Sequence, residues 1–162
     1  MDIIPAEVSR IGDIRMIAHN TWPAAYGNIL PAQQIDYMLE LFYSPDALKA
    51  QMEDGQCFFI ALINDKPVAF AAWQMISPHL GKLQKLYVLP EVQGRNIGNK
   101  LLDHVITSAR NEGAKKLELN VNRHNPAKVF YEKAGFTINR TADIDIGHGY
   151  FMNDYIMSLP LT

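Results

Sequence analysis

Gln93-Gly94-Arg95-Asn96-Ile97-Gly98 lies between a strand-like segment and a long amphipathic segment. Upstream, residues 83–88 predict a short strand that ends before Pro90, which has no N–H to donate. Downstream, apolar residues recur with helical spacing at Ile97, Leu101, Leu102, Val105, Ile106 and Ala109. Backbone N–H groups converge in a glycine-bearing loop at a helix start, and the helix dipole favours an anion there. The stretch therefore predicts a phosphate site, and more specifically a pyrophosphate site.

Two familiar phosphate loops are excluded, because the chain contains neither G-x-x-x-x-G-K-[ST] nor G-x-G-x-x-G. A second informative segment follows. Residues 116–121 alternate apolar and polar side chains, as a strand does. The next run, Asn125-Pro126-Ala127-Lys128-Val129-Phe130-Tyr131-Glu132-Lys133-Ala134-Gly135-Phe136, predicts a compact helix. Asn125 suits its N-cap, Pro126 its first position and Gly135 its C-terminal end.

Together these segments resemble the GCN5-related N-acetyltransferase (GNAT) superfamily from about residue 83 to residue 136. The loop is similar to the family's Q/R-x-x-G-x-G/A motif, and the later segment to N-x-x-A-x-x-F/L-Y-E-K-x-G-F. Asn96 departs from the usual first glycine, but asparagine tolerates a positive φ better than other non-glycine residues. The resemblance implies an α+β (mixed α/β) GNAT acyl-CoA acyltransferase fold, with a central mixed sheet, splayed parallel strands and flanking helices. One domain over residues 1–162 is expected.

The resemblance also implies that acetyl-CoA is the cosubstrate and that one group of residues binds it. This group comprises Leu86, Tyr87, Val88, Gln93, Gly94, Arg95, Asn96, Ile97, Gly98, Asn99, Asn125 and Lys133. Asn125 has a second interpretation as a simple helix cap. Basic residues flank the loop in the sequence and either steer a polyanion or form a solvated face: Lys82, Lys85, Arg95 and Lys100.

Tyr131 matches the tyrosine that, in many members of the family, protonates or stabilises the leaving CoA thiolate. The alternative is a buried structural tyrosine with a satisfied hydroxyl. The general base stays open among Glu118, His148 and a chain of water molecules. A single histidine between two glycines, as at His148, is more often a loop residue than a base. No metal ligands are predicted.

The acceptor site is expected from the N-terminal helices and the last strands. Aromatic faces and a carboxylate suit a cationic amine, and the candidates are Trp22, Tyr26, Tyr37, Asp154 and Tyr155. The alternative is that these aromatic residues only fill the core. Residues 21–43 and 146–155 also resemble bacterial spermidine/spermine acetyltransferases of the PaiA type. A polyamine is therefore one candidate acceptor.

Composition and charge limit the partners and the cellular compartment that we expect. The 162 residues carry 15 basic and 17 acidic side chains, a formal charge of −2, which disfavours a nucleic-acid surface. No apolar stretch reaches 18 residues, no signal peptide is recognisable, and the single cysteine excludes an intramolecular disulfide, so a cytoplasmic protein without membrane association is expected. The aromatic and Met-rich strand at residues 150–159 favours a homodimer, as in many members of the superfamily.

Three functions stay open: a small-molecule amine N-acetyltransferase, a protein or peptide N-acetyltransferase, and a non-catalytic acyl-CoA-binding domain.

The periodicity of apolar residues predicts the remaining helices and strands. Helices are expected at residues 11–20, 30–42 and 45–54, and strands at 3–5, 58–63, 68–75, 136–140 and 150–159, with a turn over 64–67.

Overall fold

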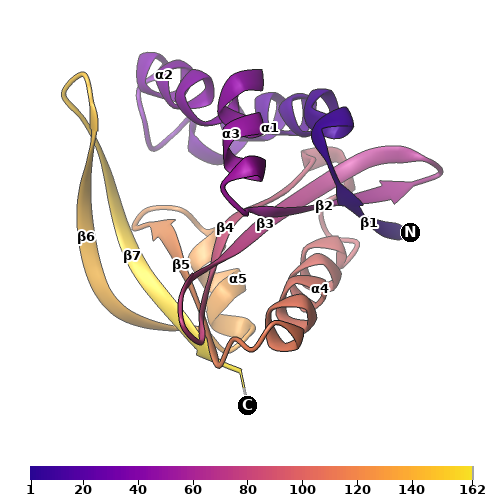
Figure 1. Cartoon of the computed structure of the whole chain (residues 1–162). Helices are drawn as coiled ribbons and strands as arrows, with labels where there is room; N and C mark the ends of the chain where they lie inside the picture. Colours follow the sequence, from indigo (N-terminus) through magenta and orange to yellow (C-terminus); the bar gives the residue numbers. More distant parts are fainter. Residues whose placement is uncertain (162) are drawn as a thin grey trace.

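The computed structural model describes residues 1–161 and contains a seven-stranded mixed sheet with helices on both faces (Figure 1). Its strands are β1 (Asp2–Ala6), β2 (Cys57–Ile63), β3 (Lys66–Ser77), β4 (Leu80–Val88), β5 (Lys116–Asn122), β6 (Thr137–Gly147) and β7 (Tyr150–Pro160). Its α-helices are α1 (Ile11–Tyr26), α2 (Ala32–Tyr43), α3 (Pro45–Glu53), α4 (Ile97–Asn111) and α5 (Ala127–Lys133). Two short 3-10 turns cover Val8–Arg10 and Pro90–Val92.

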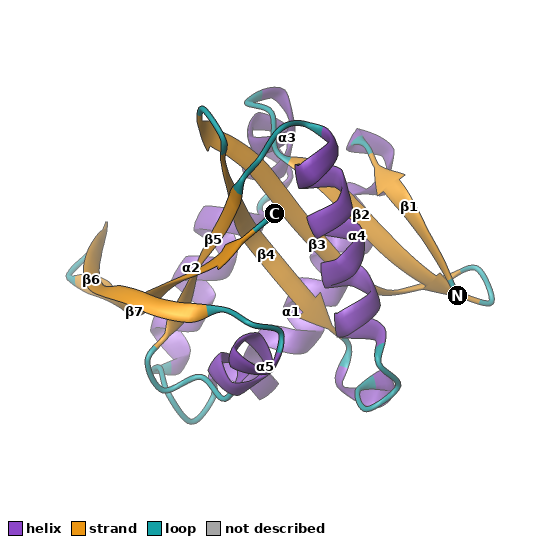
Figure 2. Cartoon of the chain, turned by 90° about the horizontal axis from the view of Figure 1, so that it is seen from below, coloured by secondary structure: helices purple, strands orange, loops and turns teal. Residues whose placement is uncertain are grey.

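The sheet separates two hydrophobic cores. The strand order is β1-β2-β3-β4-β5-β7-β6, and only β4 and β5 are parallel. Helices α1, α2 and α3 cover one face, while α4 and α5 cover the other (Figures 1 and 2). Strand residues alternate between the cores because successive side chains point to opposite faces: Phe58 and Ile60 pack against α1–α3, and Phe59 and Ala61 against α4.

The parallel strands β4 and β5 separate partway along their length. They pair only from Leu80 opposite Lys116 to Leu83 opposite Leu119. Beyond that point β4 pairs with β3 alone and β5 with β7 alone. The expected mixed sheet with splayed parallel strands is confirmed. The separation leaves backbone groups of β4 without a strand partner on one side, and such groups need another partner.

A β-bulge lies at the start of the separation. Lys85 lies opposite Ala72, but Leu83 lies opposite Trp73, so Gln84 is an extra residue in β4. A bulge bends its strand and changes which side chains share a face. Lys82 and Lys85, three residues apart, therefore line the same cavity.

Three local predictions need correction. Helix α1 continues beyond residue 20 and through Pro23, because Trp22 and Tyr26 extend its buried face. The hairpin turn uses only Asn64 and Asp65, both with positive φ, so residues 66 and 67 belong to β3.

The third correction concerns the last strand, residues 150–159, from which the sequence favoured a homodimer. β7 pairs with β5 on one side and β6 on the other, so it is not a sheet edge, and the edge is β6. In Figure 1 the β6–β7 hairpin rises beside α2 at the left of the molecule. The sequence pattern did not show that two consecutive strands would fold back in this order.

Candidate active site

The predicted phosphate loop has the backbone geometry that an anion site needs at the start of α4. Asn96 has a left-handed conformation with φ +63°, and Gly94 has φ +84°. Asn96 therefore takes the left-handed conformation that asparagine tolerates better than other non-glycine residues. Within residues 1–161 no side chain caps the first turn of α4, so its N–H groups are free to bind an anion. Asn99 Nδ2 donates to Asn96 Oδ1 at 2.6 Å and fixes the loop.

A cleft of about 730 Å³ runs from this loop along β4 to α5. The predicted cofactor residues in its lining are Leu86, Val88, Gln93, Gly94, Asn96, Ile97, Gly98, Asn99 and Asn125. At Gly98 a Cβ would lie 3.4 Å from the Phe130 ring and would narrow the cleft there. Three features of the cleft suit a pyrophosphate with an extended arm: Gly98, the uncapped start of α4 and the unpaired edge of β4.

Three predicted cofactor residues lie elsewhere. Arg95 and Lys133 are exposed and outside the cleft lining. Tyr87 points to the other face of the sheet and lines a different cavity. For Tyr87 the alternation along β4 explains the difference, since its neighbours Leu86 and Val88 face the cleft.

Tyr131 lies on α5 at the end of the cleft nearest the strand separation. Its ring packs edge-on against Phe130 and Phe136, at centroid distances of 5.1 and 5.7 Å, and only 8% of the residue is exposed. Burial, and secondarily the neighbouring Tyr26, raises the pKa of Tyr131 well above its ordinary value. The hydroxyl therefore holds its proton at neutral pH and is available as a donor.

The Asn125 side chain caps the first N–H of α5, although the N-cap residue is Pro126 and the helix begins at Ala127, one position later than predicted. Its Oδ1 accepts a hydrogen bond from the Ala127 N–H at 2.9 Å. The Phe136 N–H donates to the Tyr131 carbonyl at 3.0 Å, and Gly135 has φ +105°, which together close α5. The cap uses the amide oxygen of Asn125, and its amide nitrogen is left for other contacts.

A second cavity of about 360 Å³ lies on the α1–α2 side of the sheet. Of the five predicted acceptor residues, Trp22, Tyr26 and Asp154 line it. Two side-chain contacts hold the β6–β7 hairpin against α2 beside this cavity: Gln34 Nε2 donates to the Phe151 carbonyl at 3.0 Å, and Tyr37 Oη donates to the Ile146 carbonyl at 2.6 Å.

The structure does not bring Tyr37 and Tyr155 into the cavity lining. Tyr37 supports the turn between β6 and β7, where its ring lies 4.8 Å from that of His148. Tyr155 follows Asp154 on β7 and therefore points to the opposite face, where Lys128 Nζ lies 5.4 Å from its ring centroid.

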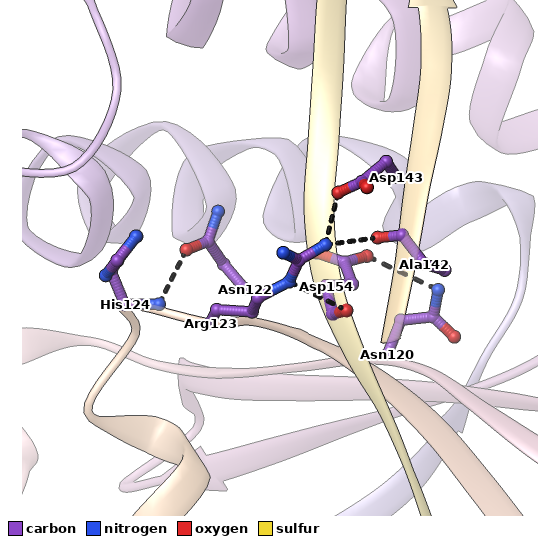
Figure 3. A network of polar contacts seen from close by, with 7 residues as sticks. All are labelled: Asn120, Asn122, Arg123, His124, Ala142, Asp143 and Asp154. Atoms are coloured by element: carbon purple, nitrogen blue, oxygen red, sulfur yellow. Dashed lines mark hydrogen bonds and ion pairs between the residues drawn. The ribbon is translucent and has the colours of Figure 1, made fainter. Parts of the chain in front are cut away.

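A polar network holds Asp154 at the β5–β7 end of the second cavity (Figure 3). Asn120 Nδ2 donates to Asp154 Oδ2 at 3.3 Å. Arg123 donates to the carbonyls of Asp154 and Ala142 and pairs with Asp143. Burial raises the pKa of the Asp154 carboxyl, and the Asn120 hydrogen bond and the charges of Lys82 and Arg123 oppose that shift.

Lys85 lies in the same cavity, close to α2 and β2, and no sequence pattern predicted this position. Lys85 Nζ donates to Gln56 Oε1 at 3.0 Å and lies 5.3 Å from the Phe58 ring centroid and 5.9 Å from that of Tyr43. Burial lowers the pKa of Lys85 to about 7. Lys82 and Lys85, which flank the phosphate loop in the sequence, lie outside the cleft that begins at this loop. The bulge at Gln84 places both in the lining of the second cavity, so neither forms part of a basic face beside the loop.

The two named candidates for the general base line neither cavity. Glu118 is buried and lies 3.9 Å from the Arg140 guanidinium. His148 is exposed in the turn between β6 and β7. Of the residues considered in the sequence, Asp154 is the carboxylate that lines the second cavity.

Comparison with known proteins agrees with this geometry. The acetyltransferase (GNAT) domain family matches residues 30–145. An uncharacterised N-acetyltransferase of Mycobacterium tuberculosis is 39% identical over 77 residues, which are 47% of this chain and 49% of the relative. The peptidyl-lysine N-acetyltransferase YjaB of Salmonella typhimurium is 33% identical over 82 residues, half of each chain. The chain spans about half the length of these curated relatives.

A solved structure shares the fold over almost the whole chain. The PaiA N-acetyltransferase of Thermoplasma acidophilum, crystallised with coenzyme A, superposes with a TM-score of 0.83 at 23% identity over 99% of both chains. The chain thus shares the fold of this N-acetyltransferase over almost its whole length. The chain belongs to the GNAT family of acetyltransferases. None of the helices described is long and apolar enough to cross a membrane.

Proposed function

We propose that this protein transfers the acetyl group of acetyl-CoA to a primary amine of a small molecule by direct transfer. One observation carries the proposal: two cavities border the separated end of β4, one beginning at an anion-binding loop and the other lined by Asp154. The coenzyme A in the Thermoplasma PaiA structure supports the assignment of the first cavity.

Acetyl-CoA, when bound, supplies an acetyl group held on a thioester. The N–H groups at the start of α4 bind its pyrophosphate, and main-chain groups of Leu86 and Val88 pair with its pantetheine arm. A backbone N–H near Leu86 stabilises negative charge on the thioester oxygen during transfer. These residues place the reactive carbon at the opening between β4 and β5.

Tyr131 supplies the proton that the leaving group needs. The amine nitrogen forms a bond to the acetyl carbon while the bond from carbon to sulfur breaks, and the sulfur takes a proton from the Tyr131 hydroxyl. An amine that arrives as ammonium loses two protons in all, so one replaces the Tyr131 proton and the other goes to solvent. Trp22, Tyr26 and Asp154 hold the amine in the second cavity through aromatic faces and a carboxylate.

The shape of the second cavity favours a small acceptor. Helices α1 and α2 and the β6–β7 hairpin surround it, and Gln34 and Tyr37 tie the hairpin to α2. A peptide acceptor needs an open groove instead. The named activity of the relative YjaB keeps protein N-acetylation as the second candidate.

Two measurements test the proposal. Millimolar acetyl-CoA should raise the melting temperature, because a ligand that binds only the folded state stabilises it. A thiol-release assay across polyamines, aminoglycosides, amino acids and peptides should then show turnover with small amines. A melting temperature that does not move would contradict acetyl-CoA binding, and a shift without turnover on any acceptor would favour a non-catalytic acyl-CoA-binding domain.

A further inference from the structure

The second cavity has opposite charges at its two ends. Asp154 lies at the β5–β7 end, where Asn120 contacts it. Lys85 lies at the other end, where it contacts Gln56 and the rings of Tyr43 and Phe58. A molecule that fills the cavity meets an anion at one end and a cation at the other.

The cation at the Lys85 end has no acidic partner. Among residues 1–161 no carboxylate lies within 4.0 Å of Lys85 Nζ. Lys85 Nζ donates to Gln56 Oε1, which leaves two of its three N–H groups without an acceptor among the residues described. An incoming anion would restore the charge that burial disfavours at this amine.

Lys82, the other cation in the cavity lining, belongs to the Asp154 end. It lies opposite Glu118 in the β4–β5 register, and its charge acts on Asp154. At the end of the cavity away from Asp154, the positive charge in the lining therefore comes from Lys85.

Two buried oxygens in residues that line the cavity also need partners. Gln51 Oε1 and Asn120 Oδ1 have no hydrogen-bond partner among the residues described. Gln51 lies at the Lys85 end, because the Gln56 N–H donates to the Gln51 carbonyl. Asn120 lies at the Asp154 end. An unpaired buried acceptor costs about 1–3 kcal/mol, so each end favours a ligand with an N–H donor.

We propose that the acceptor is a diamino acid, with its reacting side-chain amine at the Asp154 end and its carboxylate on Lys85. The ammonium beside that carboxylate then donates to Gln51 Oε1, and the reacting amine donates to Asn120 Oδ1 before transfer. This inference rests on the proposed function and names its acceptor class. It changes the expectation of a polyamine, because a polyamine would place a second positive charge against Lys85.

Matched pairs of amines test the inference. L-Lysine differs from cadaverine, and L-ornithine from putrescine, only by a carboxylate. We expect kcat/KM to be at least about tenfold higher for the amino acid in one of these pairs, since a charge-assisted contact in a buried site contributes that much. A wild-type kcat/KM for the diamine equal to or above that for the amino acid in both pairs would overturn the inference and leave the N-acetyltransferase proposal standing.

Two variants locate the carboxylate site. Lys85→Met should remove most of the preference for the amino acid while changing diamine turnover much less. Lys82→Met, which removes the same charge from the other end, should leave the ratio within each pair close to wild type. Retained stabilisation of Lys85→Met by acetyl-CoA would show that the variant is folded. An unchanged ratio in that folded variant would overturn the assignment to Lys85.

Failure of the underlying function gives a different result. Absence of a melting shift with acetyl-CoA, or turnover on peptides alone, would contradict the proposed small-molecule transferase and the diamino acid with it. Transfer to amines at rates that do not depend on a carboxylate in the acceptor would contradict only the assignment of a diamino acid.

Discussion

The Tyr26 hydroxyl on α1 lies 3.1 Å from the Tyr87 hydroxyl on β4. Both residues line the second cavity. Tyr26 also lies close to Asn125, whose side chain opposes the effect of burial on the pKa of Tyr26, and to Tyr131, whose pKa is raised by burial and by Tyr26. Burial raises the pKa of both phenols, so each keeps its proton at neutral pH. The pair fixes α1 over the separated end of β4, between the two cavities.

Removing this hydrogen bond should destabilise the protein slightly. Tyr26→Phe and Tyr87→Phe each lose one hydroxyl and leave the other buried, so each should lower the free energy of unfolding by about 1 kcal/mol. A double-mutant cycle measured by urea denaturation should show that the two losses are not additive. Additive losses would mean that the two hydroxyls do not interact, and Tyr150→Phe provides a control at a tyrosine outside this pair.

Tyr131→Phe should affect turnover far more than binding. The ring packing against Phe130 and Phe136 is kept, so stability should change little. Loss of the proton donor should lower kcat by about 10²-fold or more, with acetyl-CoA affinity close to wild type. Steady-state kinetics and an acetyl-CoA melting titration separate the two effects, and unchanged turnover would give Tyr131 a packing role only.

The cofactor side was more predictable from sequence than the acceptor side, for a physical reason. An anion site at a helix start needs a local arrangement, and Gly94, Asn96 and Gly98 are adjacent in the chain. Asn125 and Gly135 likewise lie at the start and the end of α5, and every residue of that helix is within ten positions of each. Local backbone chemistry of this kind is visible in a short stretch of sequence.

The acceptor cavity instead depends on contacts between distant segments. Lys85 meets Gln56 across 29 positions, and Asn120 meets Asp154 across 34. The bulge at Gln84 decides that Lys82 and Lys85 face the same cavity, and a strict two-residue alternation does not predict a bulge. The same alternation, applied to Asp154 and Tyr155, would have separated them onto opposite faces.

Gly98→Val should weaken acetyl-CoA binding. A Cβ at this position lies 3.4 Å from the Phe130 ring, and the γ-methyl groups of valine would narrow the cleft further. We expect at least a tenfold higher Kd, or about 1.4 kcal/mol, from an acetyl-CoA titration. Gly12→Val is the matched control, because Gly12 is also the second residue of a helix and has no atom within 4 Å of its Cβ position. Equal affinity in the two variants would contradict this role of Gly98.

Lys85→Met should stabilise the protein more at pH 6 than at pH 9. Folding lowers the pKa of Lys85 from 10.5 to about 7, so between these values the unfolded chain binds more protons. The free energy of unfolding therefore rises with pH across this window, because the cost of burying a charged Lys85 falls. Below pH 7 that cost is fully present. Urea denaturation at both pH values measures the difference. Lys49→Met, at an exposed position on α3, should show no such change with pH.

A homodimer through β6 is the last expected outcome. β6 is an 11-residue sheet edge with mostly exposed side chains, whereas the opposite edge, β1, has five residues. A long edge strand presents unpaired backbone groups, and Ile138 on it is 41% exposed. A second copy could pair with this edge about a two-fold axis.

Light scattering should then report twice the 18.3 kDa chain mass for wild type and a shift toward the single-chain mass for Ile138→Lys. Val8→Lys, at an exposed apolar residue away from the edge, should stay dimeric. A particle of 18.3 kDa for wild type across a wide concentration range would rule the dimer out.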